Sequence, residues 1–179
     1  MRSYLIALIS LTFTFVSCKN ELSVLTSLKG KSKISYQESI EKWNSLKKAN
    51  GNSYIYQTTV ESWAGFGSTT ELKVVDGKVV SRMHQDFNID DKSGKRETTN
   101  SYTENENKVG SHKDGAPPLT IDELYTSCAG KYLVVEAEEN MLYFNTDEKG
   151  LMTTCGFVPN NCADDCFEGI SIDSFQWID

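Results

Sequence analysis

The stretch Thr69–Met83 reads TTELKVVDGKVVSRM, and it decides the fold class that we predict. Asp76-Gly77 stands in it between two runs that are rich in β-branched residues. An Asp-Gly pair is a strong signal for a two-residue hairpin turn, because both central positions of that turn need a positive φ angle. We therefore predict two antiparallel strands, Thr69–Val75 and a second one that starts at Lys78 and reaches Phe87.

The segments on either side extend this hairpin into a meander. Residues 54–60 alternate as a half-buried strand does, and the Gly-Phe-Gly-Ser sequence at 65–68 predicts the turn that follows them. Residues 88–96 form a polar loop, and Glu97–Asn105 predicts a fourth, threonine-rich strand. The sequence therefore predicts an antiparallel β-meander.

Two capping boxes mark the starts of helices. Ser35-x-x-Glu38 precedes an amphipathic helix over residues 36–49, and Thr120-x-x-Glu123 opens a short helix that ends at Gly130. Later strands are expected at Lys131–Glu136, Met141–Asn145, Leu151–Phe157 and Gly169–Trp177. Two helices with several short strands predict one α+β domain over residues 35–179, built as a sandwich of small antiparallel sheets.

The N-terminus has the pattern of a secretory signal. A basic start at Arg2 is followed by an uncharged apolar run over residues 4–16, which is too short to span a bilayer. Phe15-Val16-Ser17-Cys18 resembles a bacterial lipobox, so residues 1–17 are expected to be removed and Cys18 to carry a lipid. The alternative is a plain signal peptide with an incidental cysteine. In the first case the protein is exported and lipid-anchored to the bacterial cell membrane or outer membrane.

Residues 18–34 are polar and rich in serine and lysine. We expect them to form a tether between the membrane and the domain. The alternative is an amphipathic first turn that packs on the body of the domain, with Leu22, Leu25 and Leu28 as its apolar residues.

Four cysteines remain if Cys18 is the lipid anchor. An even set in an exported domain predicts two disulfides, but the sequence does not choose among the three connectivities. Cys128–Cys155 with Cys162–Cys166 and Cys128–Cys166 with Cys155–Cys162 are both plausible. Zinc is a further alternative, although the spacing lacks the close-set cysteine pairs of zinc knuckles.

The charge of the chain excludes one large class of function. It has 18 Lys and Arg against 25 Asp and Glu, for a formal net charge of −7. A nucleic-acid partner is not expected, because phosphate neutralisation needs clustered basic residues. The expected partners are the membrane, through the lipid, and an envelope or secreted protein.

A set of short motifs resembles a family of exported bacterial proteins, many of them lipoproteins, whose domain has no assigned function. The resemblance spans residues 36–177, and the family usually has Gly-Tyr-Pro where this chain has Gly150-Leu151-Met152. It implies a fold and no chemistry. The motifs are Tyr54-x-Tyr56, Leu72-x-Val74-x-Asp76-Gly77-Lys78-Val79-Val80-Ser81, Thr120-Ile121-Asp122-Glu123-Leu124 and Asp164-Asp165.

Catalytic candidates are few. Ser111, His112 and Asp114 hold triad residue types, but triad members normally converge from separate segments. His112 is otherwise a solvated loop residue that could contact a ligand. Glycoside hydrolysis needs a pair of carboxylates. The chain has so many acidic residues that finding such pairs carries little weight. The candidate acids are Glu61, Glu71, Glu104 and Glu106.

Two acidic segments are candidate calcium sites. Asp86, Asn88, Asp90 and Glu97 have the spacing of an EF-hand loop, but Asp91 stands where that loop needs glycine. The second candidate is Asp164-Asp165, with Asp147 or Asp173. A solvated acidic loop is the alternative for each. Calcium is the cofactor that these acidic segments would bind.

Trp63 and Phe66 flank two glycines at a hairpin tip. Exposed aromatic side chains there could hold a sugar or a protein, whereas the alternative is that Trp63 folds back into the core. Taken together, the sequence predicts a non-catalytic binding domain of the cell envelope. An immunity or inhibitor protein against a toxin or protease, and a hydrolase that uses His112, are the alternatives.

Overall fold

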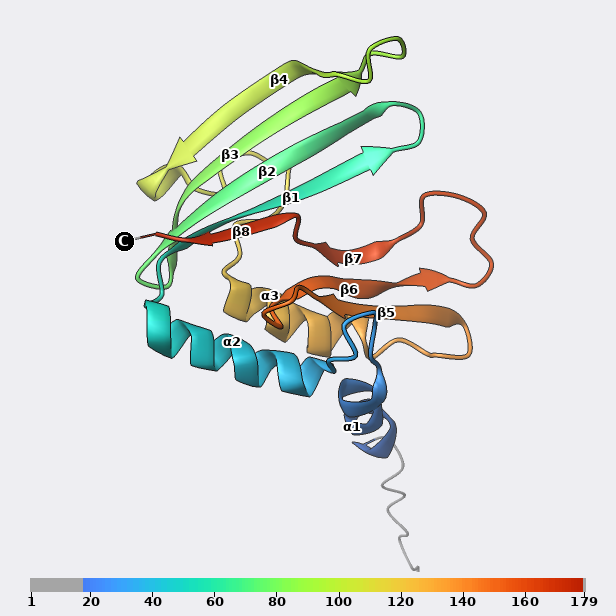
Figure 1. Cartoon of the computed structure of the whole chain (residues 1–179). Coiled ribbons are helices and arrows are strands. Elements are labelled where there is room, and N and C mark those ends of the chain that lie inside the picture. The colour runs from blue at the N-terminus through green and yellow to red at the C-terminus, as the bar shows by residue number, and fades with distance from the viewer. Residues whose placement is uncertain (1–17, 179) are drawn as a thin grey trace, which may run out of the picture.

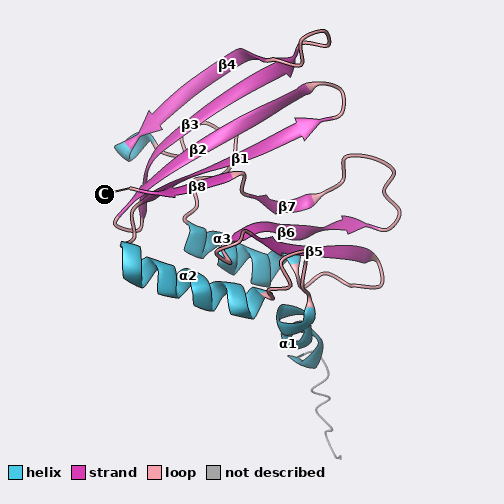
Figure 2. Cartoon of the chain, viewed as in Figure 1, coloured by secondary structure: helices cyan, strands magenta, loops and turns pink. Residues whose placement is uncertain are grey.

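A computed structural model describes residues 18–178 of the chain (Figure 1). The predicted signal segment, residues 1–17, lies outside the described residues. The predicted fold class is confirmed: the chain is α+β, with a five-stranded and a three-stranded antiparallel sheet (Figure 2). Three α-helices lie on one side of the larger sheet (Figure 2).

The larger sheet contains the predicted meander. Its order is β4-β3-β2-β1-β8, and every pair is antiparallel. Asp76 and Gly77 both have positive φ angles, 49° and 75°, as the hairpin between β2 and β3 requires. The five strands are β1 (Tyr54–Ser62), β2 (Phe66–Val75), β3 (Lys78–Ile89), β4 (Arg96–Asn105) and β8 (Ser174–Trp177).

The turn that we expected at residues 65–68 lies earlier in the chain than predicted. β2 begins at Phe66, which pairs with Ser62, so the chain reverses before it. Gly65 has a φ angle of 82° and its N–H donates to Ser62 O at 3.1 Å, which closes the turn. The second glycine, Gly67, is in the ladder, where a Cβ would meet Val60 O at 2.4 Å.

The smaller sheet has the order β5-β6-β7, with β5 at Asn140–Thr146, β6 at Met152–Pro159 and β7 at Glu168–Ser171. The predicted final strand, Gly169–Trp177, is therefore two strands in two sheets. The chain changes sheets at Ile172 and Asp173, whose N–H groups donate to Thr153 O at 2.7 Å and to Gln57 O at 2.8 Å. This crossing ties the two sheets together.

The expected strand Lys131–Glu136 is wrong. The helix α3 (Ile121–Ser127) continues into a π-helical turn over Cys128–Tyr132, and the N–H of Leu133 donates to Cys128 O at 3.0 Å. The helical turn places Leu133 in the core. Its apolar side chain is therefore buried without a strand.

The helix α2 (Tyr36–Asn50) has the predicted capping box: the Ser35 hydroxyl accepts from Glu38 N, and the Glu38 carboxylate accepts from Ser35 N at 2.7 Å. Its Trp43 is fully buried against the sheet. The indole of Trp43 stacks on Trp177 at 5.5 Å and meets Tyr54 edge-on at 5.4 Å. Burial of large aromatic side chains is the strongest source of core stability, at about 1.5–3 kcal/mol for each.

A helix occupies part of the segment that we expected to be a tether. The helix α1 (Cys18–Ser27) is followed by an isolated bridge between Lys29 and Ser35. Val24, Leu25 and Leu28 pack against the core. Residues in the 18–34 segment are thus in contact with the domain, as in the alternative of an amphipathic turn.

The four later cysteines form two pairs at disulfide distance. Cys128 and Cys155, with Cα atoms 5.7 Å apart, join the end of α3 to β6, and both are buried. Cys162 and Cys166, with Cα atoms 6.2 Å apart, close the loop between β6 and β7. This is one of the three connectivities that the sequence left open, and one of the two named as plausible. It uses all four thiols, so none of them is left for zinc.

Candidate functional site

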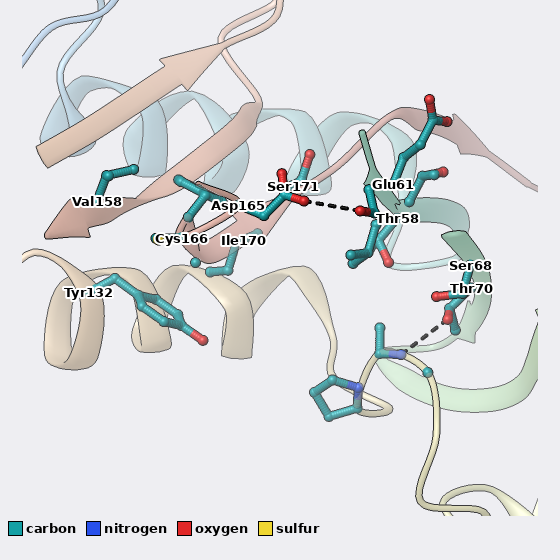
Figure 3. A pocket seen from close by; sticks show the side chains of 18 of the residues that line it. Thr58, Glu61, Ser68, Thr70, Tyr132, Val158, Asp165, Cys166, Ile170 and Ser171 are labelled. Atoms are coloured by element: carbon teal, nitrogen blue, oxygen red, sulfur yellow. Dashed lines mark hydrogen bonds between the residues drawn. The ribbon is translucent and has the colours of Figure 1, made fainter. Parts of the chain in front are cut away.

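A cleft of about 980 Å³ separates the two sheets (Figure 3). One wall is the inner face of β1 and β2, where Thr58 and Thr70 lie. The opposite wall is β7 with the loop before it, and the floor is α3 with Tyr132. Ligand pockets in proteins commonly have volumes of about 300–1,000 Å³, so this cleft is large enough for a substantial ligand.

The cleft exists because β1 is longer than β8, the strand that pairs with it on this side. Pairing between β1 and β8 runs from Tyr54 to Gln57 and stops there, while β1 itself continues to Ser62. Beyond Gln57 the chain that precedes β8 turns away and pairs with β6 as β7. Figure 1 shows β1 and β7 diverging from the point where β8 begins. The cleft lies where these two strands diverge, and residues of both line it.

A contact between the two walls closes the far end of the gap. The Ser62 hydroxyl donates to the Asp165 carboxylate at 3.0 Å, across 103 residues of chain (Figure 3). Asp165 belongs to the loop that the Cys162–Cys166 disulfide closes, and it has a positive φ angle of 44°. The disulfide loop therefore lies against the end of β1 and limits the length of the cleft.

The lining of the cleft combines apolar surface, hydroxyl groups and acids. Glu61, Asp164 and Asp165 line it, and no Lys, Arg or His does so among the described side chains of residues 23–178. The Glu61 carboxylate also accepts from Arg96 at 2.7 Å. The apolar side chains are Tyr56, Val60, Pro117, Leu119, Leu124, Tyr132, Val158, Phe167 and Ile170.

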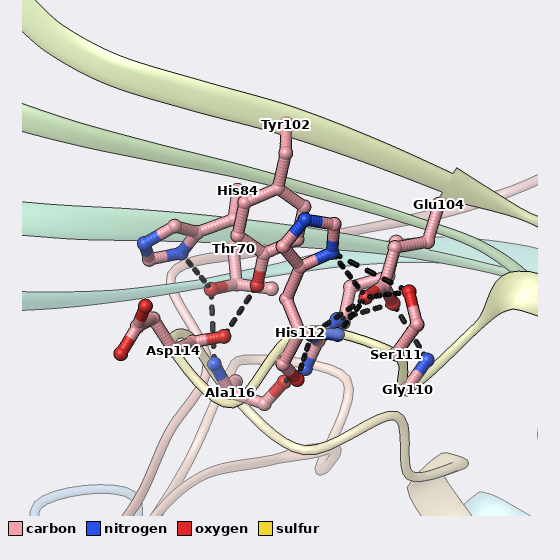
Figure 4. Close-up of polar contacts among 10 residues, drawn as sticks. Thr70, His84, Tyr102, Glu104, Gly110, Ser111, His112, Asp114 and Ala116 are labelled. Atoms are coloured by element: carbon pink, nitrogen blue, oxygen red, sulfur yellow. Dashed lines mark hydrogen bonds and ion pairs between the residues drawn. The ribbon is translucent and has the colours of Figure 1, made fainter.

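A second cluster lies on the β3–β4 side of the larger sheet (Figure 4). Arg82 and Glu104 are almost fully buried and form a two-pronged ion pair, with Nε–Oε2 at 2.9 Å and Nη2–Oε1 at 3.1 Å. The 110–116 loop covers them. Glu104 accepts from the backbone N–H groups of Gly110 and His112, both at 2.6 Å, and Arg82 donates to His112 O and Ala116 O.

Burial acts on Glu104 to raise its pKa. The hydrogen bonds from His112, Gly110 and Arg82 oppose that effect and outweigh it, so the pKa of Glu104 lies well below its ordinary value. A carboxylate that stays ionised and accepts this many hydrogen bonds holds the loop in place. It is poorly suited to act as a general acid.

Ser111 and Glu104 both approach the same ring nitrogen of His112 in this cluster. The Nδ1 atom of His112 lies 2.8 Å from Glu104 Oε1, and the Ser111 hydroxyl lies 3.4 Å from the same nitrogen. In a triad the nucleophile and the orienting carboxylate contact opposite ring nitrogens, whereas here both contact one. Asp114 takes part through its backbone carbonyl, which accepts from the Tyr102 hydroxyl. The three predicted residues are close in space but not arranged as a triad.

The His112 side chain lies at the surface of the cluster, over Glu104 and Tyr102. Its ring stacks on Tyr102 with centroids 4.0 Å apart and an interplanar angle of 11°. Its side chain is half exposed. Tyr102 also packs against His84, which shares hydrogen bonds with Thr70 and Asp86 at 3.0 Å each. Among the other acids weighed for catalysis, Glu61 pairs with Arg96, and Glu71 lies in β2. Glu106 lies in the turn after β4.

The calcium candidates are dispersed. Asp86 accepts from Asn100 and contacts His84, while Asp90 accepts from Ser93 N at 2.7 Å within its own turn. Asn88 lies on β3 opposite Glu97 of β4. Asp147 caps the turn before β6 and Asp173 lies where the chain changes sheets, apart from Asp164. Among the described side chains of residues 23–178, no three Asp, Glu, His or Cys residues group as a metal site would need.

The aromatic candidates are exposed. Trp63 has 77 % of its surface accessible and Phe66 has 55 %, so the alternative that Trp63 folds into the core is wrong. Val60 and Phe167, which line the cleft, are also exposed. Apolar side chains thus gather at the hairpin tip and at the mouth of the cleft. Exposed apolar surface of this kind often marks a binding site.

Sequence reasoning did not find the cleft itself. Thr58, Thr70, Tyr132 and Ser171 were not singled out, because nothing in their local pattern distinguishes them from other strand and helix residues. The one signal in the sequence was the cysteine loop with its two aspartates. That loop lines one side of the cleft.

No protein-family model matches the chain, and no curated protein or solved structure shows significant similarity to it. The resemblance to the exported bacterial family therefore stays a prediction. No helix within residues 18–178 is both long enough and apolar enough to cross a membrane.

Proposed function

We propose that this chain is a non-catalytic binding domain of the bacterial cell envelope, held at a membrane by a lipid on Cys18. The ligand occupies the cleft between the two sheets. The proposed anchor is supported by the lipobox-like Phe15-Val16-Ser17-Cys18 sequence and by the paired cysteines of the domain, which are typical of exported proteins.

The size and lining of the cleft are the observation that carries the binding proposal. An apolar surface with a few polar groups that converge on it is the usual composition of a ligand site. A catalytic set would need a nucleophile and a base at hydrogen-bonding distance, with the base free to take the proton. The one histidine cluster near the surface, at His112, has its Nδ1 engaged by Glu104.

Blocking the cleft tests the binding proposal. Val60 lies at the mouth of the cleft and is exposed, so Val60→Trp fills part of the opening without disturbing the core. A fragment screen followed by amide NMR is expected to shift Thr58, Thr70 and Ile170 in the native protein and to leave them unshifted in Val60→Trp. The matched control is Thr103→Trp, on an exposed strand residue outside the cleft. Shifts that persist in Val60→Trp would contradict this assignment.

Metabolic labelling with a fatty acid tests the anchor. The full-length chain is expected to take up label and to fractionate with membranes, and Cys18→Ser is expected to lose both properties. Cys166→Ser serves as the control because it removes a thiol elsewhere in the chain. Equal labelling of the native chain and Cys18→Ser would refute the anchor and leave a plain signal peptide.

A further inference from the structure

We propose that the cleft binds an extended, basic segment of polypeptide, which adds as a strand to the free edge of β1. This inference rests on the proposed function, because it takes the cleft as the binding site. It goes further in naming the chemical class of the ligand and the groups that recognise it. Strand addition to an exposed sheet edge is a common mode of peptide recognition, in which main-chain hydrogen bonds supply much of the affinity.

The first argument is the direction of the backbone groups of β1. Ser53 O accepts from Ile178 N, and Gln57 O accepts from Asp173 N, so the odd-numbered residues of β1 face the β8 side. Because successive residues of a strand point their N–H and C=O groups to alternate edges, Thr59 and Glu61 face the same side. Pairing with β8 has ended by then. Within the described chain, their backbone N–H and C=O groups have no strand to pair with.

The position of the two side chains supports this reading. The Thr59 hydroxyl lies 3.2 Å from the Thr69 hydroxyl, and the Glu61 carboxylate binds Arg96. Both contacts lie on the face of the sheet away from the cleft, because Thr58 and Val60 face inward. Thr59 and Glu61 nevertheless line the cleft. We infer that they line it with the backbone edge that faces away from β2.

The opposite wall also presents a free edge. Ile172 N donates to Thr153 O, so the even-numbered residues of β7 face β6. Gly169 and Ser171 therefore point their N–H and C=O groups away from β6, toward the cleft that they line. Two free strand edges, one from each sheet, thus face the same gap. A small apolar ligand would leave these groups unused, whereas an extended peptide can pair with them in a regular ladder of main-chain hydrogen bonds.

Charge gives the chemistry of the peptide. The carboxylates of Asp164 and Asp165 lie at the cleft, and no positively charged side chain lines it in the described part of the chain. A lysine or arginine in the peptide would find opposite charge there, while an acidic peptide would be repelled. The apolar floor with Leu119, Leu124 and Tyr132 accepts the alternate, inward-facing side chains.

The other exposed edge of the larger sheet is a weaker candidate. β4 is an edge strand whose residues are mostly exposed, and the large cleft does not include it. A peptide on β4 would gain main-chain hydrogen bonds but little apolar burial. Edges of this kind are usually protected against pairing by charged residues, and β4 carries Arg96, Glu97 and Glu104.

The direct test uses synthetic peptides on the disulfide-bonded protein. A pool of N-acetylated hexapeptides with one fixed lysine is passed over the immobilised domain, and the retained peptides are sequenced and synthesised singly. We expect binding that slows amide exchange at Thr59 and Glu61. N-methylation of alternate peptide residues in the register that faces β1 removes two or more hydrogen bonds, so we expect affinity to fall about tenfold or more.

Two matched pairs of variants separate backbone from side-chain effects. Thr59→Pro removes the N–H that faces the cleft, while β1 keeps its bonds to β2 through even-numbered residues. Thr59→Val keeps that N–H and is expected to bind normally. Asp164→Asn is expected to weaken lysine peptides about two- to fivefold, and Glu138→Gln, an equal change of charge outside the cleft, is expected to leave them unchanged.

Four outcomes would overturn the proposal. Retention of no peptide, while small fragments still shift the cleft amides, would reject strand addition and leave the binding function standing. Exchange protection confined to β4 would place the peptide at the wrong edge. Peptide affinity that is unaffected by N-methylation in either register would exclude main-chain pairing. If neither peptides nor fragments shift the cleft, the proposed function fails together with the inference.

Discussion

The inner face of the larger sheet is apolar on its β8–β1–β2 side and charged on its β3–β4 side. On the first side Tyr54 and Trp177 pack on Trp43 of α2, and Leu72 belongs to the same core cluster. On the second side Arg82 and Glu104 are buried to the same degree under the 110–116 loop. One face of the sheet thus buries an aromatic core at one side and an ion pair at the other.

What covers each side explains the difference. A helix satisfies its own backbone hydrogen bonds, so it needs only apolar side chains beneath it. A loop does not, and the N–H and C=O groups that it buries need partners from elsewhere. Glu104 and Arg82 supply those partners: the carboxylate accepts from the loop and the guanidinium donates to it. The ion pair therefore provides hydrogen bonds for the loop, whereas the aromatic cluster provides apolar contacts for the helix.

The largest expected effect comes from the aromatic side. Trp43→Ala removes a fully buried side chain that contacts Tyr54, Phe175 and Trp177. We expect the free energy of unfolding to fall by about 4–5 kcal/mol, because the cavity cannot close between helix and sheet. Denaturant unfolding of the oxidised domain measures it. A loss below about 1.5 kcal/mol, the cost of a volume-conserving change, would contradict the role given to Trp43.

The next effect comes from the charged side. Glu104→Gln leaves the Arg82 guanidinium buried without its counter-charge, and we expect a loss of about 3 kcal/mol. The double change Arg82→Gln with Glu104→Gln removes both charges and keeps polar atoms for the loop. It should cost about 1–2 kcal/mol less than the sum of the two single changes. Strict additivity in this double-mutant cycle would mean that the two charges do not interact.

The charged side also predicts an acid dependence that the aromatic side lacks. Because the pKa of Glu104 is lower in the folded state than in the unfolded state, its stabilising effect is complete above the unfolded pKa of about 4.3. The effect is lost as the pH falls from there toward the folded pKa. Unfolding midpoints measured from pH 7 to pH 2 should fall less steeply in Glu104→Gln. Glu106→Gln, an exposed neighbour, should keep the native slope.

The smallest expected effect is at the cover of the charged cluster. His112→Ala removes one stacked ring and one side-chain contact to Glu104, but the side chain is half exposed. We expect a loss of about 1 kcal/mol. Lys113→Ala, in the same loop, is the control and should have little effect. If His112→Ala abolished an enzymatic activity while stability changed this little, the non-catalytic proposal would be wrong.

The sequence predicted the elements whose stabilising contacts are local. The Asp76-Gly77 hairpin and the two capping boxes depend on residues within a few positions of one another, and all three are present in the structure. The expected strand Lys131–Glu136 failed because Leu133 is buried by a helical turn, while Val134 is exposed. The single final strand failed because Ile172 and Asp173 bond to strands of different sheets, at Thr153 and Gln57.

The candidate site also has parts that the sequence could predict and parts that it could not. The sequence singled out the Cys162–Cys166 loop, its aspartates and the aromatics at the hairpin tip, since residue type alone marks them. It could not show that Asp165 reaches Ser62, because that contact depends on the path of the chain between them. It also could not show that Glu104 is buried, because glutamate in a polar strand is normally exposed.

The amino-acid sequence by itself determined the fold class, the meander and the helix starts, because hydrophobic period and turn chemistry act over short distances. The tertiary structure alone decided which cysteines pair and where the polypeptide leaves one sheet for the other. It also decided that β1 extends beyond β8 with its backbone edge facing a cleft. These features depend on the packing of segments that lie far apart in the chain, and no local pattern of residues encodes that packing.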